Sequence, residues 1–232
     1  MKAPSVARRG ARAPRGIAGS ILALLAGLLA SCATAPPRDP AATATPDLVE
    51  LVALDSTIRL DVRYATANNF VGRPVYPANP RVLLQRPAAE ALVRASARLR
   101  GQGYGLLVFD GYRPWSVTKL FWQITPPAKR DFVADPRKGS RHNRGCAVDL
   151  TLYELASGRE VAMPSPYDEF SERAHPGYAG GTSEERRHRD LLRAAMEAAG
   201  FTVYEHEWWH FDYRDWERYP VLDLPIDSGP GS

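Results

Sequence analysis

The sequence predicts an α+β fold in a single domain, with a small central antiparallel or mixed sheet flanked by helices. Segments with the alternation or the short apolar runs of strands are interspersed with segments of helical periodicity, without a regular strand–helix–strand order. No internal repeat is visible, and no second break in composition follows residue 47. The 232 residues of the chain are ample for one hydrophobic core.

Residues 1–32 have the pattern of an export signal. Within this segment, basic residues lie only in the first 15 positions. Residues 17–30 form an uncharged apolar run that is too short to indicate a membrane span. The run ends in Leu29-Ala30-Ser31-Cys32, which resembles the lipobox where bacterial lipoproteins are cleaved and lipidated. Ordinary signal cleavage after residues 33–35 is the alternative. We expect lipidation of Cys32, and therefore a periplasmic protein anchored to the outer membrane of a Gram-negative bacterium.

The charge balance changes once this signal is set aside. The whole chain has 30 Lys and Arg against 26 Asp and Glu, and residues 1–32 hold five of the basic side chains and none of the acidic ones. The remainder, with 25 basic and 26 acidic side chains, is close to neutral, so nothing argues for nucleic acid as a partner.

Residues 33–47 are rich in Pro, Ala and Thr and predict a flexible tether between the membrane and a domain at residues 48–232. After Cys32 only Cys146 remains, so the domain has no internal disulfide and depends on its hydrophobic core.

The first elements of the domain are two strands and two helices. Residues 58–64 alternate apolar and polar side chains and predict a half-buried strand. Residues 87–100 have helical spacing and end near two glycines, which predicts a helix. The apolar run at residues 104–109 is typical of a buried strand. A turn at residues 110–114 follows, and Pro114 is well placed to open a helix that continues through Gln123.

The second half of the domain predicts two further strands and a long helix. Residues 146–152 form a strand after a turn at Gly145, and the last strand covers about residues 208–213. Residues 183–199 form a charged amphipathic helix, with Ser183 as the N-cap and Gly200 as the C-terminal stop.

The strand at residues 146–152 separates an apolar face from a polar one. Val148 lies on the face expected in the core, whereas Asp149 lies on the other face and is expected to point toward a cleft. Gly145 allows the chain to reverse, so that His142 can return toward Asp149. Taken alone, this pair fits a surface carboxylate and a loop histidine, each satisfied by water, better than it fits a metal site. Cys146 shares the parity of Val148 and is therefore a poor candidate ligand.

The segment Glu207-Trp208-Trp209-His210 carries a second candidate pair. In a continuous strand Glu207 and His210 would lie on opposite faces, and the aromatic residues around them are poor helix formers. We therefore expect Glu207 at a bend just before the strand and His210 within it. Alternatively, Glu207 is a solvated charge and His210 a core histidine.

The two segments are complementary. Together they supply two imidazoles and a carboxylate for a metal, and a further carboxylate that stays off it, which is the inventory of a catalytic zinc site. Arg113, in a Gly-Tyr-Arg-Pro turn after a buried strand, offers fixed donors for an oxyanion, unless a nearby carbonyl or carboxylate occupies it.

These motifs resemble those of the D-alanyl-D-alanine dipeptidases, in the zinc D-Ala-D-Ala peptidase superfamily that includes the vancomycin-resistance dipeptidases. The resemblance covers about residues 48–219. The Ser-x-His-x(6)-Asp element at residues 140–149 is shared across the superfamily, whereas the turn at 111–114 and the segment at 207–210 are more specific to the dipeptidases. The other matching motifs are Tyr64-Ala65-Thr66 with Asn69-Phe70, Gly103-Tyr104-Gly105-Leu106-Leu107, Asp149-Leu150-Thr151-Leu152-Tyr153 and Tyr167-Asp168.

The resemblance implies the hedgehog-like fold of this superfamily and one zinc ion per chain, held by His142, Asp149 and His210. It also implies that Glu207 is the catalytic base and acid and that Arg113 stabilises the tetrahedral intermediate. The implied reaction is hydrolysis of D-alanyl-D-alanine to two D-alanine.

The resemblance also implies three substrate-binding residues. Asp168 matches the position that receives the substrate ammonium, and Ser140 and Tyr76 match substrate contacts. The chain departs from the pattern at Arg141, where a small residue is often found.

Two other functions fit the same metal set. One is a D,D-carboxypeptidase, or an L,D-peptidase or endopeptidase, acting on peptidoglycan stem peptides. The other is a zinc fold without activity that binds cell-wall fragments. Asp168 distinguishes the dipeptidase from the first alternative, because a longer chain has an amide where a dipeptide has its free amine.

Overall fold

A mixed five-stranded sheet forms the centre of the computed structural model, which describes residue 1 and residues 35–227. Its strand order is β2-β4-β5-β7-β6, with β2 parallel to β4 and the other neighbours antiparallel. A second, two-stranded sheet pairs β1 with β3. The strands are β1 (Leu48–Glu50), β2 (Arg59–Leu60), β3 (Leu83–Gln85), β4 (Tyr104–Asp110), β5 (Ala147–Glu154), β6 (Phe201–Tyr204) and β7 (Glu207–Tyr213). The predicted α+β class is confirmed.

The predicted helices begin and end close to the expected positions: they are α2 (Arg86–Arg100), α3 (Trp115–Ile124) and α4 (Ser183–Ala199). A short helix, α1 (Leu51–Leu54), was not predicted. The predicted N-cap of α4 was wrong by one residue. Thr182 is the cap, since its side chain accepts a bond from the Glu185 amide while the Glu185 carboxylate accepts one from the Thr182 amide. Gly200, with φ of +98°, ends the helix as expected.

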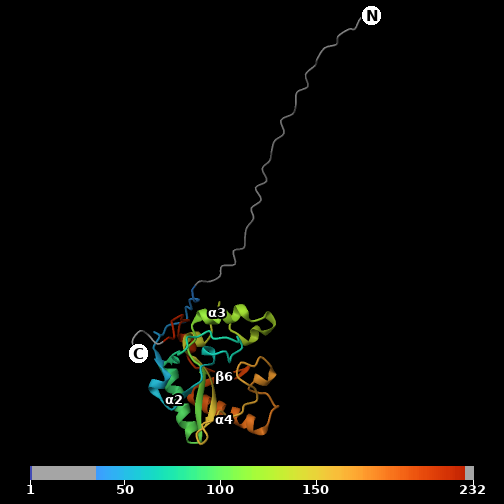
Figure 1. Cartoon of the computed structure of the whole chain (residues 1–232). Coiled ribbons are helices and arrows are strands. Elements are labelled where there is room, and N and C mark those ends of the chain that lie inside the picture. The colour runs from blue at the N-terminus through green and yellow to red at the C-terminus, as the bar shows by residue number, and fades with distance from the viewer. Residues whose placement is uncertain (2–34, 228–232) are drawn as a thin grey trace. The chain divides into compact units, whose positions relative to one another are not determined.

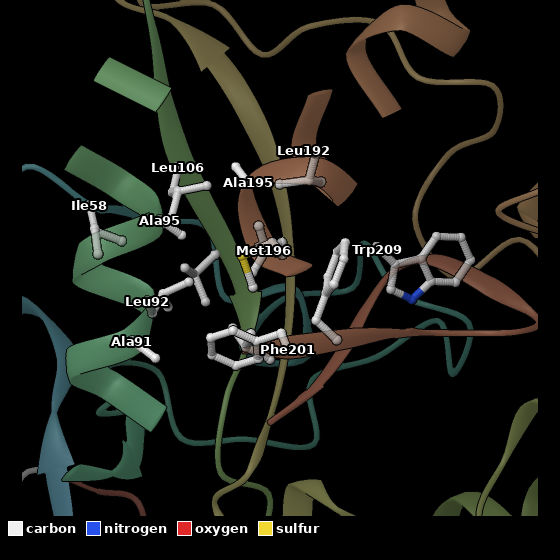
Figure 2. Close-up of a cluster of buried hydrophobic side chains, with 14 of the residues drawn as sticks. Ile58, Ala91, Leu92, Ala95, Leu106, Leu192, Ala195, Met196, Phe201 and Trp209 are labelled. Carbon is white, nitrogen blue, oxygen red and sulfur yellow. The ribbon is translucent and has the colours of Figure 1, made fainter. Parts of the chain in front are cut away.

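Helices α2 and α4 pack together and build the main core against the sheet, whereas α3 lies apart from them (Figure 1). Figure 2 shows Leu92 of α2, Leu106 of β4 and Met196 of α4 within one cluster of buried side chains. Within the described chain, no helix is long and apolar enough to cross a membrane.

Strand β5 has the two faces that its sequence predicts. Val148, Leu150 and Leu152 lie in the main core, and Cys146 lies there too. Burial raises the pKa of the Cys146 thiol to about 12, which is unfavourable for a metal ligand. Asp149, on the other face, lines a cavity.

The predicted strand at residues 58–64 was wrong over most of its length. Only Arg59 and Leu60 pair with β4, and a 3-10 turn follows at Arg63–Ala65. The Ala65 amide closes this turn by donating to the Val62 carbonyl, and the Tyr64 carbonyl accepts the amides of Val75 and Tyr76, which brings the following loop back to the turn.

The signal segment and Cys32 lie outside the described residues. The flexibility of the predicted tether, residues 33–47, remains a prediction. Part of this segment forms hydrogen bonds and an ion pair with the domain. The Asp39 carboxylate pairs with Arg144 at 2.7 Å, and the Ala44 amide donates to the Arg218 carbonyl at 2.8 Å.

Gly145 connects the His142 turn to β5, and its backbone and surroundings both exclude a side chain. Its φ is +69°, and a Cβ there would lie 2.5 Å from Leu48 Cδ2. Gly103 has a φ of +87° but nothing within 4 Å of its Cβ position, so a substitution there tests the backbone conformation without the steric contact.

We expect Gly103→Ala to cost about 1–2 kcal/mol from the left-handed backbone alone. Gly145→Ala should cost about 1–3 kcal/mol more, because Leu48 must move. Urea unfolding of residues 33–232 measures both. Equal losses in the two variants would show that the contact with Leu48 is unimportant.

Candidate metal centre and active site

Three neighbouring strands place polar side chains in one row. Asp110 of β4 is paired with Asp149 of β5, which is paired in turn with His210 of β7. Directly opposed residues of adjacent strands have their side chains close together on one face. The register of β4 shifts between Val108 and Asp110, and a bulge of this kind redirects the side chains that follow it.

The second histidine reaches this row from a loop. His142 opens a 3-10 turn (His142–Arg144), which ends at Gly145. Its Nδ1 donates to the Gly111 carbonyl at 2.7 Å, so the opposite ring nitrogen, Nε2, faces Asp149. The Asn143 side chain binds the Arg113 carbonyl and Thr118, which fixes the loop against α3.

The geometry of His142, Asp149 and His210 fits a metal ion. Their nearest atoms lie 3.0 to 3.2 Å apart: His210 Nδ1 to Asp149 Oδ1, His142 Nε2 to His210 Nδ1, and His142 Nε2 to Asp149 Oδ1. Ligands of a tetrahedral zinc, at about 2.0–2.2 Å from the ion, are about 3.3 Å apart. The buried Asp149 Oδ1 has no hydrogen-bond partner of adequate geometry. A cation between the three atoms would satisfy all of them.

Asp149 carries negative charge in this site. Burial favours its neutral form, but His142 and His210 outweigh that effect and hold its pKa well below the usual range. A carboxylate that stays ionised is the form that binds metal.

Glu207 lies beside the metal position without belonging to the ligand group. Its Oε2 is 3.7 Å from His210 Nδ1, and both residues line the cavity. The predicted bend before the strand was wrong in position, since Glu207 is the first residue of β7. The irregularity is internal: Tyr204 pairs with Glu207 but Val203 pairs with Phe211, which leaves residues 208–210 as an insertion. This insertion allows residues of opposite parity to share one face.

Burial raises the pKa of Glu207 to about 8 in the metal-free protein. Asp149 and Asp168 raise it further, whereas His210 and Arg113 lower it. Glu207 therefore holds a proton near neutral pH as long as no cation occupies the site.

Arg113 is paired with a carboxylate, as one of the two sequence interpretations expected, and it also lines the cavity. Its Nε donates to Asp110 Oδ2 at 2.9 Å, and its terminal nitrogen is 3.7 Å from Asp149 Oδ2. The Tyr76 hydroxyl donates to the other Asp110 oxygen at 2.9 Å. Tyr76 is not among the described residues that line this cavity. It contacts two that do: the ring of Tyr64, at 5.6 Å between ring centres, and Arg113 through Asp110.

Asp168 lines the cavity in a half-buried position with a left-handed backbone. Its φ is +61°, and its carboxylate accepts bonds from the Tyr64 hydroxyl at 3.0 Å and the Phe70 amide at 3.3 Å. Burial, followed by the charge of Asp149, raises its pKa to about 7. Ser140 also lines the cavity, while its hydroxyl accepts the Asn143 amide at 3.2 Å.

The cavity has a volume of about 130 Å³, and much of its wall is aromatic. Phe70 and Phe170 are in ring contact at 5.1 Å, and Phe170 stacks on Phe132 at 4.8 Å. The sequence interpretation did not anticipate the contact between these three phenylalanines, which lie outside the α-helices and strands.

Other supporting residues were also missed. Asp110 holds Arg113, the Tyr167 hydroxyl donates to Asp149 Oδ2 at 3.0 Å, and Asp212 Oδ1 is 2.9 Å from His210 Nε2. Strand parity could have found Asp212, because it lies two residues after His210 and thus on the same face.

Comparisons with known proteins give one consistent assignment. The model of peptidase family M15, described as D-ala-D-ala dipeptidase, matches residues 44–223. A D-alanyl-D-alanine dipeptidase of Enterococcus faecium is 38% identical over 73% of this chain and 93% of its own length. A D-alanyl-D-alanine dipeptidase of Escherichia coli K12 is 34% identical over 77% and 90%.

Among solved structures, the vancomycin-resistance D,D-dipeptidase VanXYg, in complex with a D-Ala-D-Ala phosphinate analogue, is 23% identical. It covers 60% of this chain and 54% of its own, with a TM-score of 0.37, which is too distant to add to the assignment. The family match spans most of the chain, including every residue of the metal group, and the two relatives are matched over nearly their whole length. The chain therefore belongs to the D-Ala-D-Ala dipeptidase family, peptidase family M15.

Proposed function

We infer that this chain is a zinc-dependent dipeptidase that hydrolyses D-alanyl-D-alanine to two D-alanine. One observation carries this inference: a His-Asp-His group converges inside a small cavity, with Glu207 beside it and outside the ligand group. That arrangement provides three ligands, an open position and a base, as a hydrolytic zinc site requires. The family match supports the choice of substrate.

His142, Asp149 and His210 would hold the zinc through Nε2, Oδ1 and Nδ1. When bound, zinc makes a water nucleophilic at neutral pH and polarises the substrate carbonyl. Glu207 takes a proton from the attacking water and returns it to the leaving amine. Arg113, fixed by Asp110, donates to the oxygen that gains negative charge, and its buried ion pair keeps it in place before substrate arrives.

Asp168 is proposed to bind the free ammonium of the dipeptide. Its carboxylate lies on the cavity wall, where two hydrogen bonds hold it. A longer stem peptide would present a neutral amide there, so this residue favours a dipeptidase over a carboxypeptidase that uses the same metal set. Ser140 contributes a second polar group to the wall, whereas Tyr76 supports Asp110 from behind.

We further propose that the enzyme works in the periplasm, anchored through a lipid on Cys32. The support is the sequence alone: a basic segment, an uncharged apolar run and a lipobox-like ending, followed by Ala33.

Glu207→Gln should separate catalysis from metal binding. We expect kcat to fall by about 10²–10⁴, because the proton acceptor is lost, while bound zinc stays at one per chain. Release of D-alanine and metal content after dialysis measure the two effects. Full turnover by this variant would contradict the proposed role.

The same variant should stabilise the metal-free fold at high pH. Because burial raises the pKa of Glu207 from 4.5 to about 8, the folded metal-free state binds more protons than the unfolded state between these values. The contribution of the Glu207 carboxyl group to the free energy of unfolding therefore decreases as the pH rises from about 4.5 to about 8. The difference in melting temperature between Glu207→Gln and wild type should grow from pH 4.5 to pH 8.5. A difference independent of pH would rule out this ionisation.

Asp168→Asn tests the choice of substrate. We expect kcat/KM for D-Ala-D-Ala to fall by about 30-fold or more, as for one partner of a buried charged pair. Its activity on N-acetyl-D-Ala-D-Ala, which lacks the ammonium, should not fall. L-Ala-L-Ala is the stereochemical control. Wild-type cleavage of stem pentapeptides as fast as D-Ala-D-Ala would refute the dipeptidase proposal.

Cys32→Ala tests the anchor. We expect the variant to lose incorporation of labelled palmitate and to appear in the soluble periplasmic fraction. Cys146→Ala is the matched control, since that thiol is buried and should leave labelling unchanged. Unlabelled wild-type protein would favour ordinary signal cleavage.

A further inference from the structure

The outer nitrogen of the His210 ring faces a carboxylate that lies outside the cavity. His210 Nε2 is 2.9 Å from Asp212 Oδ1, while Nδ1 is turned toward Asp149 and His142. A proton on Nε2, bound to Asp212, leaves the lone pair of Nδ1 free for a metal. Asp212 is not among the described residues that line the cavity, and it contacts two residues that do, His210 and Arg141.

The backbone around Asp212 keeps it in register with His210. Within β7, Asp212 is paired with Ala147 of β5 on one side and with Thr202 of β6 on the other. Its side chain is only 13% exposed, so water competes weakly for the bond to the histidine ring.

The two histidines are held by different kinds of partner. His142 donates its outer N–H to the Gly111 carbonyl, a backbone group that substitution leaves in place. His210 depends on a side chain, which substitution can remove. Partners of this kind fix the tautomer and orientation of a ligand and raise its basicity.

Arg141 connects the two ligand segments. It precedes His142 in the chain, its Nε is 3.5 Å from Asp212 Oδ2, and its guanidinium lies 4.7 Å from the centre of the Trp216 ring. The Arg141 side chain is 40% exposed, so this ion pair contributes less than the bond between Asp212 and His210.

We propose that Asp212 is a positioning residue that orients His210 for zinc binding, and that Arg141 restrains Asp212. This proposal rests on the zinc site of the proposed function. It assigns a use to Arg141, the position where this chain departs from the family pattern.

The test measures zinc affinity of the purified full chain by competition with a chromophoric chelator. We expect Asp212→Asn and Asp212→Ala to bind zinc about 10–100-fold more weakly than wild type. Arg141→Gln should weaken zinc binding by less than about fivefold. Asp190→Asn, which makes the same charge change at an Arg-paired position on α4, should bind zinc like wild type.

Two further readouts separate positioning from a general structural role. The visible spectrum of the cobalt(II) form should change in the Asp212 variants, because the orientation of His210 changes. The melting temperature of the metal-free Asp212→Asn protein should stay within a few degrees of wild type. Wild-type affinity and an unchanged cobalt spectrum in both Asp212 variants would overturn the proposal, as would a loss of affinity matched by unfolding of the metal-free protein. Failure of the wild-type chain to bind zinc would instead refute the proposed function.

Discussion

The concentration of buried carboxylates around one point is the constraint on which the rest of the site depends. Asp149 and Glu207 are at most 9% exposed, and Asp168 lies on the same cavity wall. Burial raises the pKa of Glu207 to about 8 and that of Asp168 to about 7. Without a cation, the protein therefore limits this negative charge by holding protons on these carboxyl groups. A divalent cation would reverse that balance, so the site is built around a positive charge.

The sheet makes this arrangement possible by separating packing from chemistry. One face of β5 lies in the core with α2 and α4, which holds the strand rigidly, and the other face carries Asp149. The two strands beside β5 are irregular where they reach the site, at Phe109 in β4 and at residues 208–210 in β7. Regular pairing sets the spacing between Asp149 and His210. The irregularities in β4 and β7 orient Asp110 and Glu207 toward these two residues.

Much of this could be predicted from the sequence, because residue type and strand parity decide it. Asp149 and the core-facing side of β5 follow from a period of two, and the boundaries of α2 and α4 follow from helical periodicity and glycine stops. The bulge in β7 could not be predicted, since parity alone gives no reason for three inserted residues. Contacts between distant loops were equally inaccessible, which explains why the Tyr76 bond to Asp110 was not expected.

The metal group does not by itself select a substrate, because the same ligands suit any peptide carbonyl. In the function we propose, selection would depend on what happens to Asp168 when the wrong substrate enters. A dipeptide would pair its ammonium with this carboxylate, whereas a longer peptide would leave the carboxylate desolvated and opposite an amide. Leaving a buried charged group unpaired costs more than an ordinary contact contributes, so exclusion is a stronger source of specificity than attraction. The bonds from Tyr64 and Phe70 keep Asp168 from turning away, and this fixed position makes the mismatch unavoidable.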